Sequence, residues 1–212
     1  MALHTTTLWG LVHDARRDLA EDLAGLTEAQ WATESLCAGW SVEEVVAHLT
    51  AAASVGRWRW IRSIVAAGFR PAVHNERRLR EQVGPTPADT LARFEAVVES
   101  RVAPSSDTAA YLGEVLVHGH DIRRPLGLPT ATPVEAWTTV AEFYARRDFT
   151  VPSRSLTTGL RLRATDGPFE AGSGPEVAGP TMALVVTMAG RSALRNQLSG
   201  DGAAILGERI PG

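Results

Sequence analysis

Apolar residues follow a helical period along the first two thirds of the chain. Between residues 8 and 23, leucine, valine and alanine recur every three or four positions, with aspartate and arginine between them. A helix places such residues on one face, so this segment is predicted to form an amphipathic helix. The same period predicts four further helices. Because the first four have short connections, we expect them to form an up-and-down four-helix bundle.

Helix start signals locate the second helix. Ser41 and Glu44 have the spacing of a capping box, in which each side chain accepts a hydrogen bond from the backbone N–H of the other residue. The second helix is predicted to begin there and to continue toward Ala67. The basic run at residues 76–81 has interleaved acids and is interpreted as a solvated helix face or loop.

Threonine, serine and proline mark the remaining helices. Thr86 and Asp89 predict the start of a third helix, and residues 104–107 predict the start of a fourth. The fourth must end near Pro125, because proline lacks the N–H that continues a helix. Residues 132–135 have the pattern of a further capping box with proline at the first helical position, which predicts a fifth helix.

The pattern changes after residue 150. Residues 160–165 alternate apolar and polar side chains, as in a half-buried strand, and the glycine-rich residues 171–175 predict turns. The apolar run 182–186 is compatible with a helix or a strand, and a helix is favoured. A short helix is predicted over residues 191–198, followed by a turn at 199–202.

These elements predict a mainly α protein with a small α+β C-terminal part. We expect a helical bundle in residues 1–149 and a small α+β domain in residues 150–212. A chain of 212 residues is long enough for a proper hydrophobic core. Its 44% apolar and 21% charged residues are near globular averages and argue against disorder.

Charge and cysteine content narrow the class of function. A net charge of −3 and a pI near 6.1 give no broad positive field, which argues against a nucleic-acid partner. Cys37 is the only cysteine, so an intramolecular disulfide is excluded. The N-terminal residues lack a signal-peptide pattern, and no apolar run has the length of a membrane span. We therefore expect a cytoplasmic protein without a membrane partner, either a monomer or a homodimer.

Three ionisable residues on the predicted helices could share a metal ion. Glu114 and His118 are four residues apart and would lie on one helix face. His48 lies in an apolar helical run, where a buried imidazole needs a hydrogen bond or a metal. Three nitrogen or oxygen ligands with one open position are typical of catalytic zinc sites. The spacing alone favours an ordinary helix-face pair and a satisfied core histidine, because Glu-x-x-x-His is a less specific pattern than His-Glu-x-x-His.

Three stretches of the sequence resemble the mycothiol-dependent maleylpyruvate isomerase family, whose N-terminal domain is a DinB-like four-helix bundle. The first stretch is residues 35–49 (SLCAGWSVEEVVAHL), and the second is residues 113–121 (GEVLVHGHD). The third combines residues 189–191 with residues 198–202, and is similar to the small C-terminal domain of the family. The resemblance spans nearly the whole chain and is most specific in the first two stretches.

The resemblance implies a divalent metal, usually zinc, held by His48, Glu114 and His118 with one position open. It also implies mycothiol as the thiol cofactor, a small electrophilic substrate, and roles for Asp121 and Arg191 in catalysis and cofactor binding. A zinc-bound thiol is deprotonated near neutral pH and can add to an activated double bond. In the family's named reaction, reversible addition lets a cis double bond rotate before elimination. A guanidinium such as that of Arg191 suits a substrate carboxylate.

Several alternatives stay open at the level of sequence. Isomerisation, thiol transfer to another electrophile, and non-catalytic binding of a thiol or small ligand are all compatible with one scaffold. Asp121 could orient a ligand imidazole, hold the thiol, or form a charge pair with Arg124 at the end of the helix. We expect Cys37 to be a small buried residue and His120 to be solvated.

Overall fold

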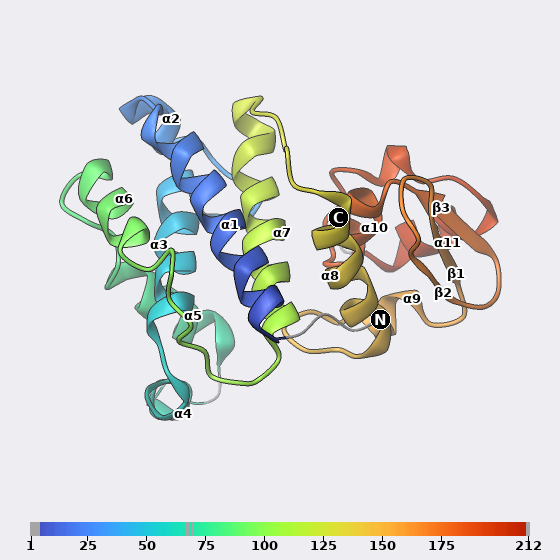
Figure 1. The fold of residues 1–212 in the computed structure, drawn as a ribbon, viewed down its shortest axis with the longest axis horizontal. Helices are drawn as coiled ribbons and strands as arrows, with labels where there is room; N and C mark the ends of the chain where they lie inside the picture. The colour runs from blue at the N-terminus through green and yellow to red at the C-terminus, as the bar shows by residue number, and fades with distance from the viewer. Residues whose placement is uncertain (1–4, 67, 69, 211–212) are drawn as a thin grey trace. The chain divides into compact units, whose positions relative to one another are not determined.

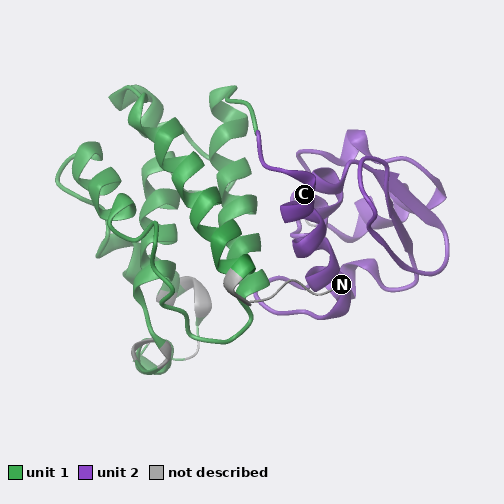
Figure 2. Cartoon of the chain, viewed as in Figure 1, with its two compact units in different colours: residues 1–130 green, residues 131–212 purple. Residues whose placement is uncertain are grey.

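The structure is a computed structural model that describes residues 5–66, 68 and 70–210 (Figure 1). The chain divides into two compact units, residues 1–130 and residues 131–212 (Figure 2). The described residues are mostly helical, and a small three-stranded sheet lies in the second unit. The predicted fold class, mainly α with a small α+β C-terminal part, is confirmed. Among the described residues, no helix combines the length and the apolar character of a membrane span.

Four helices form the bundle of the first unit: α1 (Thr5–Ala24), α3 (Val42–Ser54), α6 (Pro87–Glu95) and α7 (Thr108–Leu126). Both α1 and α3 pack against α6 and α7. Near the N-termini of α1 and α7, Trp9 stacks on Tyr111. Near their C-termini, Arg123 donates a hydrogen bond to Asp22 at 2.6 Å. The two helices therefore run parallel, as Figure 1 shows, whereas the first and fourth helices of the expected up-and-down order would be antiparallel.

Three further helices lie in the described part of the first unit: α2 (Glu28–Trp31), α4 (Arg57–Ala66) and α5 (Pro71–Arg80). The predicted second helix thus ends at Ser54 instead of continuing toward residue 67, which lies outside the described residues. It ends because Val55 is extended, with φ −106° and ψ 106°. Most of the basic run 76–81 lies in α5, where Leu79 is buried and the arginines at 77 and 80 are exposed, as expected of a solvated helix face.

Capping boxes fix the starts of α3 and α6, as predicted. The N–H of Glu44 donates to the Ser41 hydroxyl at 3.3 Å, and the N–H of Ser41 donates to the Glu44 carboxylate at 2.8 Å. Thr86 and Asp89 form the equivalent pair of bonds at α6, with proline in its first turn. Each box satisfies two backbone donors that a helix end would otherwise leave without partners.

Helix α8 (Val134–Arg146) belongs to the second unit, where it packs on α9 (Ser153–Thr157) and α10 (Thr181–Met188). The observed division at residue 130 therefore differs from the expected boundary at residue 149, because the buried face of α8 contacts the following helices. The capping box predicted at residues 132–135 does not form. Pro133 occupies the N-cap position, and its side chain has no hydrogen-bonding group.

The sheet of the second unit has the strand order β2-β1-β3, formed by β1 (Arg161–Ala164), β2 (Glu170–Gly172) and β3 (Glu176–Gly179). Strand β1 pairs antiparallel with β2 and parallel with β3. The predicted strand at 160–165 is thus confirmed, and the apolar run 182–186 is helical within α10. The predicted helix at 191–198 is reduced to the 3-10 turn η1 (Arg195–Gln197), and α11 (Asp201–Arg209) begins inside the expected turn.

Candidate metal centre

Helix α3 holds His48 inside the first unit. The capping box fixes the start of this helix, and His48 follows about two turns later, among the fully buried Val45 and Val46. Its own side chain is almost buried, with 8% of the residue exposed. The Trp40 ring lies 5.1 Å from the imidazole, centroid to centroid. The apolar face of α3 thus fixes the depth at which the imidazole sits.

Helix α7 brings Glu114 and His118 to the same place. The Nε2 atom of His48 lies 2.8 Å from Oε1 of Glu114, and Nε2 of His118 lies 3.8 Å from that same oxygen. The two imidazole rings are 5.1 Å apart and nearly perpendicular, at 79°. One donor atom from each of the three residues lies within 4.8 Å of the others. The structure therefore brings together the three residues predicted as metal ligands.

The donor set of this triad fits a zinc ion. Zinc bonds to nitrogen and oxygen are about 2.0–2.2 Å long, so a tetrahedral ion places neighbouring donors about 3.4 Å apart. The separations from Glu114 to His48 and His118, 2.8 and 3.8 Å, lie on either side of this value. Small side-chain rotations would therefore bring the three atoms into coordinating positions. Three protein ligands would leave a fourth position for a thiol or substrate.

Asp121 lies behind His118, one turn further along α7. Its carboxylate is fully buried, and its Oδ2 atom is 3.2 Å from Nδ1 of His118. A carboxylate that accepts the second N–H of a ligand imidazole fixes the orientation and the tautomer of that ring. Of the roles considered for Asp121 from sequence, this geometry favours the orientation of a ligand imidazole.

The surroundings of His118 also change its acidity. Burial alone would lower the pKa of the imidazole. Its hydrogen bonds to Asp121 and Cys37 and the negative charge of Glu114 have the opposite effect, and together they raise the pKa to about 10. A protonated imidazole has no lone pair for a metal. Metal binding at neutral pH must therefore displace a proton from His118.

Cys37 is a neighbour of the site that the sequence analysis missed. Its thiol donates to Oδ2 of Asp121 at 3.0 Å, and its sulfur lies 3.2 Å from Nδ1 of His118. The side chain is half-buried, so the expectation of a small buried residue does not describe its contacts. The backbone N–H of Leu36 also donates to the main-chain carbonyl of Asp121 at 3.0 Å. These contacts join a connector to a helix about eighty positions away, which no local spacing could indicate.

Predictions were also made for His120 and Arg191. His120 is buried, with 3% of the residue exposed, so the prediction of a solvated histidine is wrong. His120 lies in α7, where most side chains between residues 112 and 123 are buried, unlike those of a surface helix. Arg191 belongs to the second unit, where it follows α10 and donates from its guanidinium to the main-chain carbonyl of Ala189 at 3.1 Å. The contact of Arg191 with a substrate stays a prediction.

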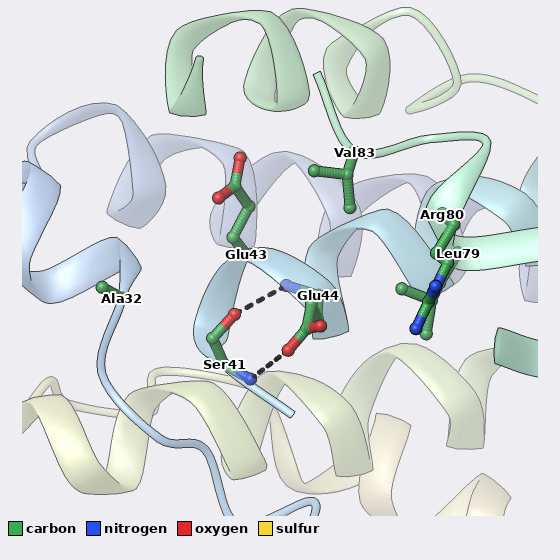
Figure 3. Close-up of a pocket in the computed structure, with 7 residues that line it drawn as sticks. All are labelled: Ala32, Ser41, Glu43, Glu44, Leu79, Arg80 and Val83. Atoms are coloured by element: carbon green, nitrogen blue, oxygen red, sulfur yellow. Dashed lines mark hydrogen bonds between the residues drawn. The ribbon is translucent and has the colours of Figure 1, made fainter. Parts of the chain in front are cut away.

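A pocket of about 560 Å³ lies beside the N-terminus of α3, around the Ser41–Glu44 capping box (Figure 3). It is lined by Ala32, Ser41, Glu43, Glu44, Leu79, Arg80 and Val83. His48, Glu114 and His118 are not among these lining residues, so this pocket is distinct from the candidate metal centre. Its acidic side chains already accept hydrogen bonds, Glu44 from Ser41 and Glu43 from Thr90.

Comparisons with known proteins agree with the fold and with the N-terminal unit. Residues 12–110 match the family described as the mycothiol maleylpyruvate isomerase N-terminal domain. This match includes His48 but ends before Glu114 and His118. A crystal structure of the mycothiol-dependent maleylpyruvate isomerase superposes with a TM-score of 0.66 and 16% identity, covering 95% of this chain and 94% of that chain.

A histidine-to-alanine mutant of that isomerase gives the same TM-score, identity and coverage. None of the curated proteins matches the chain significantly. The resemblance predicted from the sequence is thereby confirmed. At 16% identity the solved structures establish the fold alone, and the family match covers residues 12–110 of the N-terminal unit.

Proposed function

We propose that this chain, whose residues 12–110 match the mycothiol maleylpyruvate isomerase N-terminal domain, is a metal-dependent enzyme that uses mycothiol on a small electrophilic substrate. The reaction is isomerisation of an activated double bond or transfer of the thiol to the electrophile. The observation that carries the proposal is the convergence of His48, Glu114 and His118 from two helices on one point. We place the protein in the cytoplasm, because its single cysteine gives no sign of an oxidising compartment.

Each residue has a defined part in this proposal. His48, Glu114 and His118 would hold a divalent metal, most readily zinc given two imidazoles and a carboxylate. The bound ion lowers the pKa of a coordinated thiol and so supplies a thiolate nucleophile at neutral pH. Asp121 accepts a hydrogen bond from the Nδ1–H of His118 and keeps Nε2 directed at the centre. Arg191 would bind a carboxylate of the substrate through two parallel hydrogen bonds.

The metal content of the purified protein tests the centre. We expect the wild type to carry near-stoichiometric zinc by elemental analysis, and His48→Ala and Glu114→Ala to lose it. His13→Ala is a matched control, because His13 is an equally buried imidazole on α1 that contacts Glu99 instead of the site. A wild type that stays free of metal after incubation with zinc would overturn the centre.

Turnover of maleylpyruvate in the presence of mycothiol then separates an enzyme from a binding module. In an enzyme, Arg191→Ala should lose turnover and keep its zinc, because Arg191 lies outside the ligand set. A zinc-loaded wild type that binds mycothiol but converts neither maleylpyruvate nor a reactive alkylating substrate would identify a non-catalytic binding module.

A further inference from the structure

We propose a second cation site, formed by Cys37 Sγ, Asp121 Oδ2 and His118 Nδ1, that takes thiophilic divalent ions and competes with the proposed metal centre for His118. The competition rests on the proposed function, whereas the site itself rests on its own three donors. The site is a thiol, carboxylate and imidazole cluster, and it shares only His118 with the first triad.

The geometry of the three donors is compact. Sγ of Cys37 lies 3.0 Å from Oδ2 of Asp121 and 3.2 Å from Nδ1 of His118, and the latter two atoms are 3.2 Å apart. Metal bonds of about 2.3 Å to sulfur and about 2.0–2.2 Å to nitrogen or oxygen require donor separations of roughly 3.4–3.6 Å. An opening of a few tenths of an ångström therefore converts this hydrogen-bonded cluster into three ligands of one ion.

The connector that carries Cys37 is fixed beside α7. The N–H of Leu36 donates to the main-chain carbonyl of Asp121, and the N–H of Cys37 donates to the hydroxyl of Ser35 at 3.1 Å. Because Asp121 is fully buried, its carboxylate is poorly solvated and gains from a positive charge nearby. A cation held between Asp121 and Cys37 would take over the positive charge that the protonated His118 supplies there.

The chemistry of the two triads selects different ions. His48, Glu114 and His118 offer two nitrogens and an oxygen, whereas the second triad contains a sulfur. Thiolate ligands favour soft ions, so cadmium should prefer the triad with Cys37 more strongly than zinc does. On binding, the ion replaces the thiol proton of Cys37 and the Nδ1 proton of His118, and both protons leave to solvent.

His118 cannot serve both ions as a neutral imidazole. It has one nitrogen with a free lone pair and one N–H. Its Nε2 atom is near Glu114, and its Nδ1 atom is near Cys37 and Asp121. An ion bound at Nδ1 therefore removes a ligand from the proposed metal centre. Thiophilic ions should thus inhibit the protein by withdrawing His118, without reacting at the centre itself.

Titration of the full-length protein with cadmium tests the site. Cys37 is the only cysteine, so an ultraviolet thiolate-to-cadmium charge-transfer band reports on this residue alone. We expect the band in the wild type and in His48→Ala, and its loss in both Cys37→Ser and Cys37→Ala. We also expect cadmium to release zinc from the wild type, and to release less from Cys37→Ser.

Three outcomes would overturn the second site. The first is absence of the band in the wild type. The second is an unchanged band and affinity in Asp121→Ala, which would indicate cadmium bridging the cysteines of two molecules. The third is a band that saturates at one cadmium ion per two chains. If the band fails while zinc content still depends on His48, only the second site is wrong. If the band appears while zinc content does not depend on His48, the proposed function is wrong and the second site stands.

Discussion

The two units of this protein bury different kinds of polar side chain. Within the part of the chain that the structure describes, every buried histidine, aspartate and arginine belongs to the first unit: His13, Arg16, His48, His120, Asp121 and Arg123. The buried polar side chains of the second unit are serines and threonines: Ser153, Thr157, Thr181 and Thr187. Its charged side chains form pairs at the surface, such as Arg163 with Glu176. Among the described residues, buried histidines and charged side chains are thus found in the first unit alone.

The bundle can bury charged side chains because main-chain carbonyls near helix ends, or opposite charges, accept their hydrogen bonds. The Arg16 guanidinium donates to the main-chain carbonyls of Val97 and Ser100, at 3.2 and 2.8 Å, just after α6. Burial still lowers the pKa of Arg16 to about 10, because removal from water disfavours the charged guanidinium. Without such partners the cost would be several kcal/mol. The difference between the units shows that the bundle buries charged groups where main-chain carbonyls or opposite charges lie within hydrogen-bonding distance, as for Arg16 and Arg123.

Zinc should stabilise the two units unequally, and this is the largest effect that we expect. At free zinc about 1,000 times its dissociation constant, a ligand that binds only the folded state adds about 4 kcal/mol. The metal ligands lie in α3 and α7, so amide hydrogen exchange should slow in these helices and stay unchanged in α10. His48→Ala should abolish the response. Equal slowing in both units would contradict the confinement of the chemistry to the bundle.

Much of the fold, and the candidate ligands, could be predicted from the sequence, because they depend on local signals. The boxes at Ser41 and Thr86 and the four-residue spacing of Glu114 and His118 involve neighbours along one helix. Cys37 shows where such reasoning ends. Its partners are brought together by the packing of a connector against α7, and no periodicity reports that packing. The early end of α3 at Ser54 was missed for a related reason, since the apolar period continues into α4.

A glycine-to-alanine substitution in each unit tests how much space surrounds the backbone at a left-handed glycine. Gly172 has φ +77°, and a Cβ atom there would lie 2.2 Å from the carbonyl oxygen of Leu160. Gly127 has φ +66°, and a Cβ atom there would meet nothing within 4 Å. The left-handed conformation alone costs a side chain about 1–2 kcal/mol. Gly127→Ala should lose about this amount, and Gly172→Ala should lose more than about 2 kcal/mol, because strand β2 must also move away from β1.

Urea unfolding of the two glycine variants measures the difference. The second unit places β2 against β1 through close backbone contacts, whereas the first unit ends α7 at Gly127 in open space. Similar losses in the two variants would show that the sheet absorbs the added methyl group, and the contrast in backbone packing between the units would then be wrong.

The smallest expected effect is on the free energy of unfolding, and it differs between two helix starts that share a sequence pattern. Ser41 caps α3 in the first unit, whereas Thr132 lies one residue before the N-cap of α8 in the second. Removing a capping hydroxyl costs about 1 kcal/mol, so Ser41→Ala should lower the free energy of unfolding by about that amount. Thr132→Ala should change it by less than about 0.5 kcal/mol, because no capping bond is lost. Equal losses would mean that the threonine caps α8 in solution, and that both units begin their helices alike. An unequal result would show that the signal preceding His48 is used in the folded protein, and that the same pattern before α8 is overridden by Pro133.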